Sequence, residues 1–322
     1  MIDYYSQTID GRVAWTGQDL DSDSGWIYSL SSDEQAVLHQ ALGHLKRKGL
    51  KAPDFEQDDF PLASMRSSID RILNELEEGR GFILIRGLDA GRYSEEELKS
   101  LYYGLGLYMG RSVRQNPRGD LLGMVTNVGD LNDKNTRVYE TNAYLPYHTD
   151  LSDVVGLLSI QRAKNGGLSS LVSAATIYNT ILDEAPEYLE VLYRPFYFAH
   201  LGEEKPTLSP IFSYHKGKLS CRYLRQYIEL GHEIAEVSLT PEQVAAMDLF
   251  DDIMHRSAIK LDMMLEPGDI QFANNYMVLH SRTGFEDHDE PARRRKLVRL
   301  WLKMPNAREL APSFPGRNGF SD

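Results

Sequence analysis

The sequence predicts a mainly β fold with accessory helices, of the α+β class, built around a sandwich or barrel of short strands. From about residue 110 onward, short apolar segments alternate with turns rich in Gly, Pro, Asn and Asp. Two earlier segments instead repeat apolar residues at helical spacing. The 322 residues contain 42% hydrophobic residues and no repeat or obvious linker. We therefore expect a single domain, residues 1–322, with a substantial core.

Residues 1–80 are expected to form a helical buttress, with helices over 31–49 and 60–79. In the second helix, apolar residues recur at three- and four-residue steps, and Gly79 suits the position that follows a helix. The core begins with "GFILIRGL" at 81–88, an apolar run bounded by glycines that is typical of a buried strand. Ser94 and Glu97 have capping-box spacing, which predicts a helix from there to about Leu105.

The region 81–303 is expected to hold the β core, with inserted helices at about 176–194 and 240–257, followed by a C-terminal tail over 304–322. Six segments have the length and composition of strands: "DLLGMVTNVG", "DVVGLLSIQRA", "GGLSSLVSA", "KLSCRYL", "MMLEPGDIQFANN" and "RRRKLVRLWL".

Charge and cysteine content limit the partners and the compartment. The net charge of −12 gives no general electrostatic reason to bind nucleic acid or an anionic membrane, so a small molecule is the expected partner. No apolar run approaches the roughly 18 residues that span a bilayer, and "MIDYYSQTIDGRVAW" lacks the pattern of a signal peptide. The lone Cys221 suits a reducing compartment. These features predict a cytoplasmic protein, and they leave its oligomeric state open.

The stretch "YLPYHTDLSD" at 144–153 carries the first chemical signal. If it is extended, His148 and Asp150 lie on one face of a strand, as two ligands of a metal site would. The best third ligand is His280, because Pro267 and Gly268 form a turn and extended segments then lead to this histidine. Two imidazoles and one carboxylate, with other positions open, form the arrangement of non-haem Fe(II) oxygenases.

A second signal is a pair of arginines on the apolar segment "RKLVRLWL". Alternation places Arg295, Leu297 and Arg299 on the same strand face. A guanidinium on an inward face is costly unless an anion meets it, and its fork suits a carboxylate. The segment therefore predicts a site for an acidic ligand.

Four motifs in order resemble the taurine dioxygenase and clavaminate synthase superfamily of Fe(II)- and 2-oxoglutarate-dependent oxygenases. They are "HTD" at 148–150, "GGLSSLVSA" at 166–174, "PGDIQFANNYMVLHSRTGFED" at 267–287 and "RRRKLVRLWL" at 293–302. The resemblance covers about residues 80–303 and implies a double-stranded β-helix, or jelly-roll, core. It implies Fe(II), 2-oxoglutarate and O2 as cofactors, with release of succinate and CO2 and oxidation, most simply hydroxylation, of a C–H bond in a small, acidic or amino-acid-like substrate.

Residue by residue, the resemblance implies the following roles. His148, Asp150 and His280 would be the catalytic iron ligands, and Arg295 would bind the far carboxylate of 2-oxoglutarate. Ser169, or Ser170 if the alignment shifts, would assist Arg295. Arg299 would contact an acidic group of the substrate, although an internal salt bridge is the alternative. The carboxylate at position 150 favours hydroxylation over halogenation, which in related enzymes needs a small residue there.

Two further residues are candidates for substrate binding. Arg222 alternates with Ser220 on one strand face and could face the substrate, although an internal salt bridge explains it equally well. Tyr147, with Tyr139 and Tyr144, is expected to form the pocket wall.

Two rival functions use the same three ligands. A jelly roll that binds metal without turnover explains the triad but not the arginine segment. A zinc hydrolase also suits two histidines and a carboxylate, but no general base or oxyanion donor set stands out in the sequence beside them.

Overall fold

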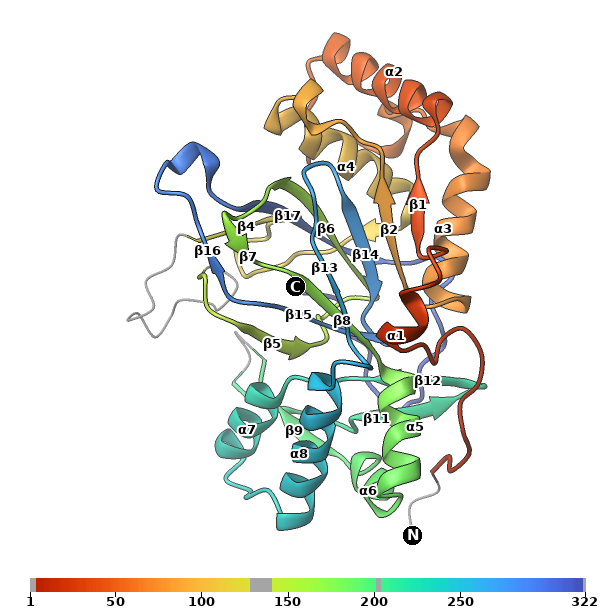
Figure 1. The fold of residues 1–322 in the computed structure, drawn as a ribbon, viewed down its shortest axis with the longest axis vertical. Coiled ribbons are helices and arrows are strands. Elements are labelled where there is room, and N and C mark those ends of the chain that lie inside the picture. Colours follow the sequence, from red (N-terminus) through yellow and green to blue (C-terminus); the bar gives the residue numbers. More distant parts are fainter. Residues whose placement is uncertain (1–3, 128–140, 201–203, 321–322) are drawn as a thin grey trace.

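The computed structural model describes residues 4–127, 141–200 and 204–320. These residues form eight α-helices and seventeen strands, so the chain is a mixed α/β, strand-rich protein. Helices α2, α3 and α4 gather at one end of the molecule and α5 to α8 at the other, with the strands between them (Figure 1). The strand-rich core is confirmed, but the helices take a larger share of the chain than an accessory layer.

The larger sheet has seven strands, and all its neighbours pair antiparallel except β1 and β2. Residues 1–80, expected to be a helical buttress, also supply the edge strand β1, which pairs with β2. In spatial order the strands are β1 (Ile27–Ser29), β2 (Phe82–Arg86), β14 (Ile270–Asn274), β6 (Val154–Gln161), β17 (Lys296–Lys303) and β3 (Arg111–Ser112), with β4 (Leu122–Thr126) also paired to β17.

The smaller sheet is antiparallel and has four strands. In spatial order they are β13 (Leu261–Met263), β8 (Ser169–Ser173), β15 (Val278–Arg282) and β5 (Leu145–His148). Three two-stranded pairs lie outside both sheets: β7 (Asn165–Gly166) with β16 (Phe285–Glu286), β9 (Phe196–Phe198) with β10 (Thr207–Ser209), and β11 (Phe212–His215) with β12 (Lys218–Cys221).

The helices follow their capping signals. Ser94 and Glu97 form the predicted capping box, although α4 continues four residues beyond Leu105. Gly49 ends α2 in the left-handed conformation, with φ of 69°. The bounds are α1 (Gly17–Leu20), α2 (Ser32–Lys48), α3 (Arg66–Glu78), α4 (Glu95–Met109), α5 (Ala174–Glu184), α6 (Glu187–Leu192), α7 (Arg225–Ile234) and α8 (Pro241–His255), with 3-10 turns at Gln57–Asp59, Ala63–Met65, Ala90–Arg92 and Pro291–Arg293.

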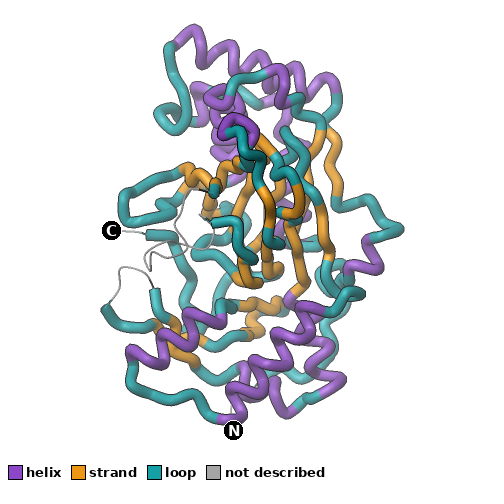
Figure 2. The backbone as a smooth tube through the Cα atoms, turned by 60° about the vertical axis from the view of Figure 1, so that its left-hand side comes forward, coloured by secondary structure: helices purple, strands orange, loops and turns teal. Residues whose placement is uncertain are grey.

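Strand alternation divides the buried side chains into three layers. On β17, Val298 and Leu300 pack toward α2, α3 and α4, whereas Leu297 and Trp301 point to the other face. On β15, Val278 joins this second group, which fills the space between the two sheets. A third cluster packs α5 to α8 against the outer face of the smaller sheet. Helices thus cover the strands at both ends of the molecule (Figure 2).

Gly268 and Phe314 each fix a connection. Gly268 precedes β14 at φ of 93°, and a Cβ there would lie 1.9 Å from the Leu88 carbonyl oxygen, so only glycine fits this predicted turn. The tail after β17 is anchored by the fully buried Phe314, which packs against Tyr276. Among the described residues, none of the helices is both long and apolar enough to cross a bilayer.

Candidate metal centre and adjoining pocket

Two neighbouring strands bring two imidazoles together. His148 is the last residue of β5, and His280 is its direct partner on β15 in the antiparallel register. Their ring centroids are 4.2 Å apart. Because side chains alternate along a strand, both rings point to the inner face of the smaller sheet, whereas Tyr147 and Leu279 point to the outer face.

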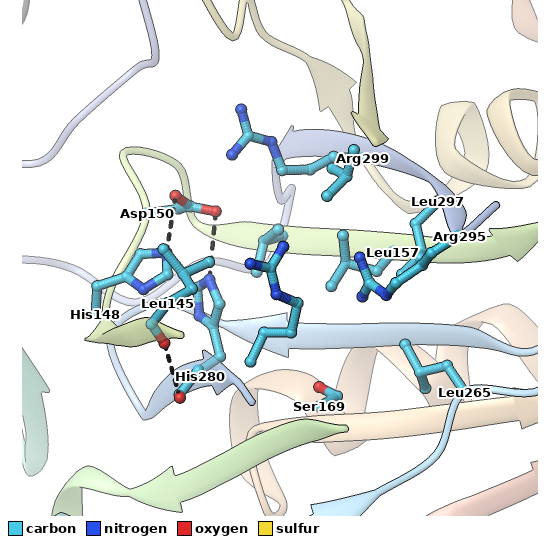
Figure 3. A pocket seen from close by; sticks show the side chains of 14 residues that line it. Leu145, His148, Asp150, Leu157, Ser169, Leu265, His280, Arg295, Leu297 and Arg299 are labelled. Carbon is cyan, nitrogen blue, oxygen red and sulfur yellow. Dashed lines mark hydrogen bonds and ion pairs between the residues drawn. The ribbon is translucent and has the colours of Figure 1, made fainter. Parts of the chain in front are cut away.

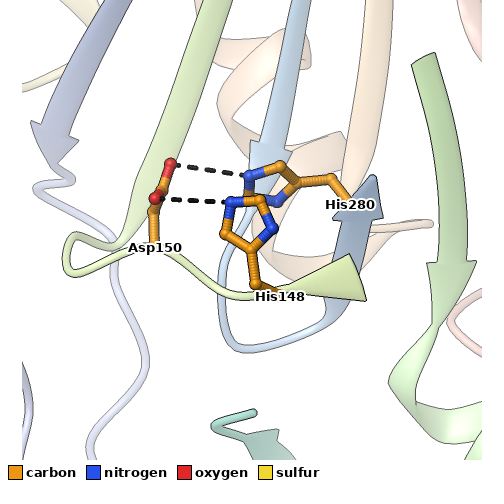
Figure 4. A group of neighbouring side chains, drawn as sticks. All are labelled: His148, Asp150 and His280. Atoms are coloured by element: carbon orange, nitrogen blue, oxygen red, sulfur yellow. Dashed lines mark ion pairs between the residues drawn. The ribbon is translucent and has the colours of Figure 1, made fainter. Parts of the chain in front are cut away.

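Asp150 completes the group from just beyond the end of β5. Its Oδ1 lies 3.8 Å from His148 Nε2 and its Oδ2 lies 3.5 Å from His280 Nε2 (Figure 4). Its backbone N–H donates to Asn275 Oδ1 at 3.0 Å, which fixes the chain where the strand ends. Within the described ranges, these three residues are the only group of three or more His, Cys, Asp or Glu side chains close enough to share a metal, with ligand atoms within 4.8 Å of one another.

The protonation states suit a metal. Burial and the neighbouring His280 lower the pKa of His148 to about 4, so its ring is neutral near pH 7. His148 Nδ1 lies 2.8 Å from the Pro146 carbonyl oxygen, so it carries the proton and leaves the Nε2 lone pair toward Asp150 and His280. Burial alone would raise the pKa of Asp150, but its hydrogen bond to His280 and the charge of Arg299 hold it below its usual range. The neutral imidazole of His148 and the ionised carboxylate of Asp150, with the His280 ring beside them, fit a divalent metal.

Trp301 supports the carboxylate from the facing sheet. Its indole N–H donates to Asp150 Oδ2 at 2.9 Å. The Arg299 guanidinium lies over the same indole, 4.7 Å from the ring centroid. Trp301 thus links the candidate metal ligand to a candidate substrate residue.

The triad opens into a pocket between the two sheets that encloses about 530 Å³, including its solvent-open part. Arg295 and Arg299 line the same pocket from the larger sheet (Figure 3). Most of the remaining wall is apolar and consists of Val125, Leu145, Val155, Leu157, Leu265 and Leu297, and its polar part is Ser169, Ser281 and Arg282.

The structure brings the three residues of the predicted strand face to one pocket, although β17 begins one residue after Arg295. Arg295, Leu297 and Arg299 all reach the pocket, and both arginines are buried. Burial and the neighbouring Arg282 lower the pKa of Arg295 to about 9, which marks a cation short of counter-charge. Arg299 is held by a hydrogen bond from Nε to Gln115 Oε1 at 2.7 Å.

The structure separates the two candidate serines. Ser169 lines the pocket and its hydroxyl donates to Gln271 Oε1 at 2.9 Å. Ser170 points to the outer face, where it contacts Tyr147 and Asp262. Of the two, only Ser169 lies where it could assist Arg295.

The other candidates lie outside the pocket. Tyr147 is on the outer face, packed edge-on against His255. Tyr144 is 43% exposed and hydrogen-bonds to His255, and Tyr139 lies outside the described residues. Arg222 lines a smaller neighbouring cavity that also borders Asp150, with its guanidinium 4.2 Å from the Phe198 ring centroid.

Two functional candidates were missed from the sequence, namely Trp301 and Arg282. Each lies two residues beyond a predicted site residue on the same strand, Trp301 after Arg299 and Arg282 after His280. The same alternation that grouped Arg295 with Arg299 would have found both.

Comparison with known proteins identifies the family. The family described as "Taurine catabolism dioxygenase TauD, TfdA family" matches residues 46–301. "FR-33289 synthase" of Streptomyces rubellomurinus is 32% identical over 324 residues, covering 98% of this chain and 96% of the relative. A taurine hydroxylase-like protein of Stachybotrys chartarum is 28% identical over 305 residues, covering 91% of this chain and 79% of the relative.

Two solved structures share the fold. Asparagine oxygenase in complex with Fe(II), 2S,3S-3-hydroxyasparagine and succinate superposes with a TM-score of 0.70 and 14% identity, over 86% of this chain and 93% of that chain. The non-haem iron oxygenase OrfP in complex with Fe and alpha-ketoglutaric acid superposes with a TM-score of 0.61 and 15% identity, over 86% of this chain and 94% of that chain.

The fold and the site thus define an iron oxygenase of the taurine dioxygenase type. The chain belongs to the TauD, TfdA family. The predicted superfamily is confirmed, and the expectation of Fe(II), 2-oxoglutarate and O2 as cofactors is confirmed at the level of the family.

The hydrogen bond from Trp301 to Asp150 gives a first testable prediction. Trp301→Phe keeps an aromatic ring at this position but removes the N–H donor. We expect Fe(II) affinity, measured by anaerobic calorimetry, to fall by about 10-fold or more, because losing a group that orients a metal ligand usually has this effect. Trp26→Phe, which alters an indole packed against Phe82 away from the site, is the matched control. Equal affinity in Trp301→Phe and the unaltered protein would show that the bond does not orient Asp150.

Proposed function

We propose that the protein is an Fe(II)- and 2-oxoglutarate-dependent dioxygenase that hydroxylates a C–H bond of a small, acidic or amino-acid-like substrate, releasing succinate and CO2. The observation that carries the proposal is one pocket with a His–Asp–His group at one end and buried arginines facing it. In this proposal the two facing sheets are those of a double-stranded β-helix, spanning 81–303 within one domain of 1–322, and the protein acts in the cytoplasm.

The roles of the chain's own residues follow from their positions. His148, Asp150 and His280 would hold Fe(II), which in this family couples O2 activation to the decarboxylation of 2-oxoglutarate. Arg295, at the end of an apolar passage, would bind the far carboxylate of 2-oxoglutarate and so fix its orientation. The leucines between them keep water from the reacting atoms.

The acidic character of the substrate rests on Arg299. Its guanidinium is buried beside Asp150 and lines the pocket, and its charge acts on the candidate metal ligand. An anionic group of the substrate, a carboxylate, sulfonate or phosphonate, would approach it with a C–H bond presented to the metal. Asparagine oxygenase and OrfP have been solved with hydroxyasparagine and with hydroxy-L-Arg, which supports a substrate of amino-acid size.

The ligand roles are tested with purified protein, Fe(II), ascorbate, O2 and 2-oxoglutarate. We expect the unaltered protein and the surface control His39→Ala to form succinate, and His148→Ala, Asp150→Ala and His280→Ala to form none while remaining folded. Metal uptake without succinate, with every candidate substrate, would instead favour a binding module. Full turnover in any of the three variants would remove that residue from the ligand set.

The role of Arg295 is tested by the apparent KM for 2-oxoglutarate. Losing a guanidinium that pairs with a desolvated carboxylate costs about 2–5 kcal/mol, roughly 30-fold or more in affinity. We expect Arg295→Ala to raise KM by that factor, and the exposed neighbours Arg293→Ala and Arg294→Ala to leave it unchanged. The reverse pattern would place the co-substrate contact on a neighbouring arginine.

Arg299→Gln tests the acidic substrate. We expect it to weaken substrate binding, read as a higher KM in substrate-dependent succinate formation, while slow substrate-independent decay of 2-oxoglutarate continues. A lower melting temperature with substrate affinity unchanged would show that Arg299 is structural.

A further inference from the structure

A second arginine, Arg282, is buried in the pocket near Arg295. The two are only 4% and 6% exposed, and both line the pocket. Elsewhere in the core, Arg80 and Arg308 are ion-paired with carboxylates. Within the described part of the chain, neither Arg282 nor Arg295 has a carboxylate at ion-pair distance.

Arg282 makes its hydrogen bonds to the described residues through one of its three guanidinium nitrogens. It lies two residues after His280 on β15, so the two side chains share a strand face. Its Nη2 donates to the carbonyl oxygens of Thr141, at 2.9 Å, and Ala143. Its Nε and Nη1 are buried and make no hydrogen bond to the described residues. The Arg282 guanidinium can therefore donate further hydrogen bonds, from Nε and Nη1, to a ligand in the pocket.

A single aromatic ring lies against both guanidiniums. Phe285 has its ring centroid 4.8 Å from Arg282 Cζ and 5.1 Å from Arg295 Cζ. Arg295 Nη1, like two nitrogens of Arg282, is buried without a partner among the described residues. The arrangement fixes two cations around one ring with unused donors on both.

The charges at this end of the pocket do not balance. One carboxylate, Asp287, lies close by: its Oδ1 accepts from the Arg295 backbone N–H at 2.7 Å, and its Oδ2 is buried without a hydrogen bond to the described residues. Two guanidiniums and one carboxylate leave one positive charge, which matches one further carboxylate. Burying a cation is costly unless it is paired and hydrogen-bonded, and an anion here would supply both.

We infer that Arg282 is a second cation of the co-substrate site, binding the far carboxylate of 2-oxoglutarate jointly with Arg295. The inference rests on the proposed function and extends it, because it predicts a preference for 2-oxo acids with a second carboxylate. Arg295 immediately precedes β17 of the larger sheet and Arg282 ends β15 of the smaller one, so the bound carboxylate would connect the two sheets.

The test compares two ligands of equal chain length in one protein. Calorimetry on Mn(II)-loaded protein, without O2, measures the affinity for 2-oxoglutarate and for 2-oxopentanoate, in which a methyl group replaces the far carboxylate. A hydrogen bond to a charged group contributes about 1.5–3 kcal/mol, so Arg282→Met should weaken 2-oxoglutarate binding by about 10-fold or more. We expect its affinity for 2-oxopentanoate to be unchanged, and the control Arg294→Met to behave as the unaltered protein does.

Other results overturn the inference. Unchanged preference for 2-oxoglutarate in Arg282→Met, or an equal loss for both ligands with a lower melting temperature, would make Arg282 a structural residue of the segment near Thr141. If Arg282→Met does not fold, the same measurement is made on Arg282→Lys. This variant keeps the positive charge but lacks the guanidinium nitrogens that could donate to a second partner. A reduced preference of Arg282→Lys for 2-oxoglutarate over 2-oxopentanoate supports the inference, and an unchanged preference refutes it. If the unaltered protein itself shows no preference for 2-oxoglutarate, the proposed function fails instead.

Discussion

The pairing of β5 with β15 is the constraint on which the site depends. Its register sets His148 opposite His280, and their imidazoles meet because both face inward. A slip of one residue would turn either ring to the outer face, where Tyr147 and Leu279 pack against the helices. That apolar packing opposes a slip, so the same side chains that build the core also set the candidate metal ligands.

Facing this sheet, β17 supplies the charge that the pocket needs. Its inner face carries Arg299 and Trp301, with Arg295 immediately before the strand, while its outer face packs against α4 and its neighbours. Trp301 connects the two halves, since it donates to Asp150 and lies beneath Arg299. An anion bound between the sheets would therefore contact elements far apart in sequence, and its binding would favour one relative placement of them.

Much of this could be predicted from residue patterns, and the exceptions have physical reasons. The strands β2, β6, β8, β14 and β17 follow from apolar runs between turns, and α4 from its capping box. Helix α7 was missed because Leu224, the residue before it, provides no side-chain cap, and because Gly231 interrupts it with a weak helix former. Tyr147 was expected to form the pocket wall, but adjacent residues on a strand face opposite ways, so it cannot share the face of His148. Ser169 and Ser170 are consecutive residues of β8, so only one of them can face the pocket. The sequence alone does not set the register that decides which one.

The most direct measurement is a crystal structure of the protein grown without O2 in the presence of Fe(II) and 2-oxoglutarate, with anomalous scattering to locate the iron. We expect iron bound by His148, Asp150 and His280, with the far carboxylate of 2-oxoglutarate between Arg282 and Arg295. Iron at any other group of residues, or a far carboxylate directed away from both arginines, would contradict it.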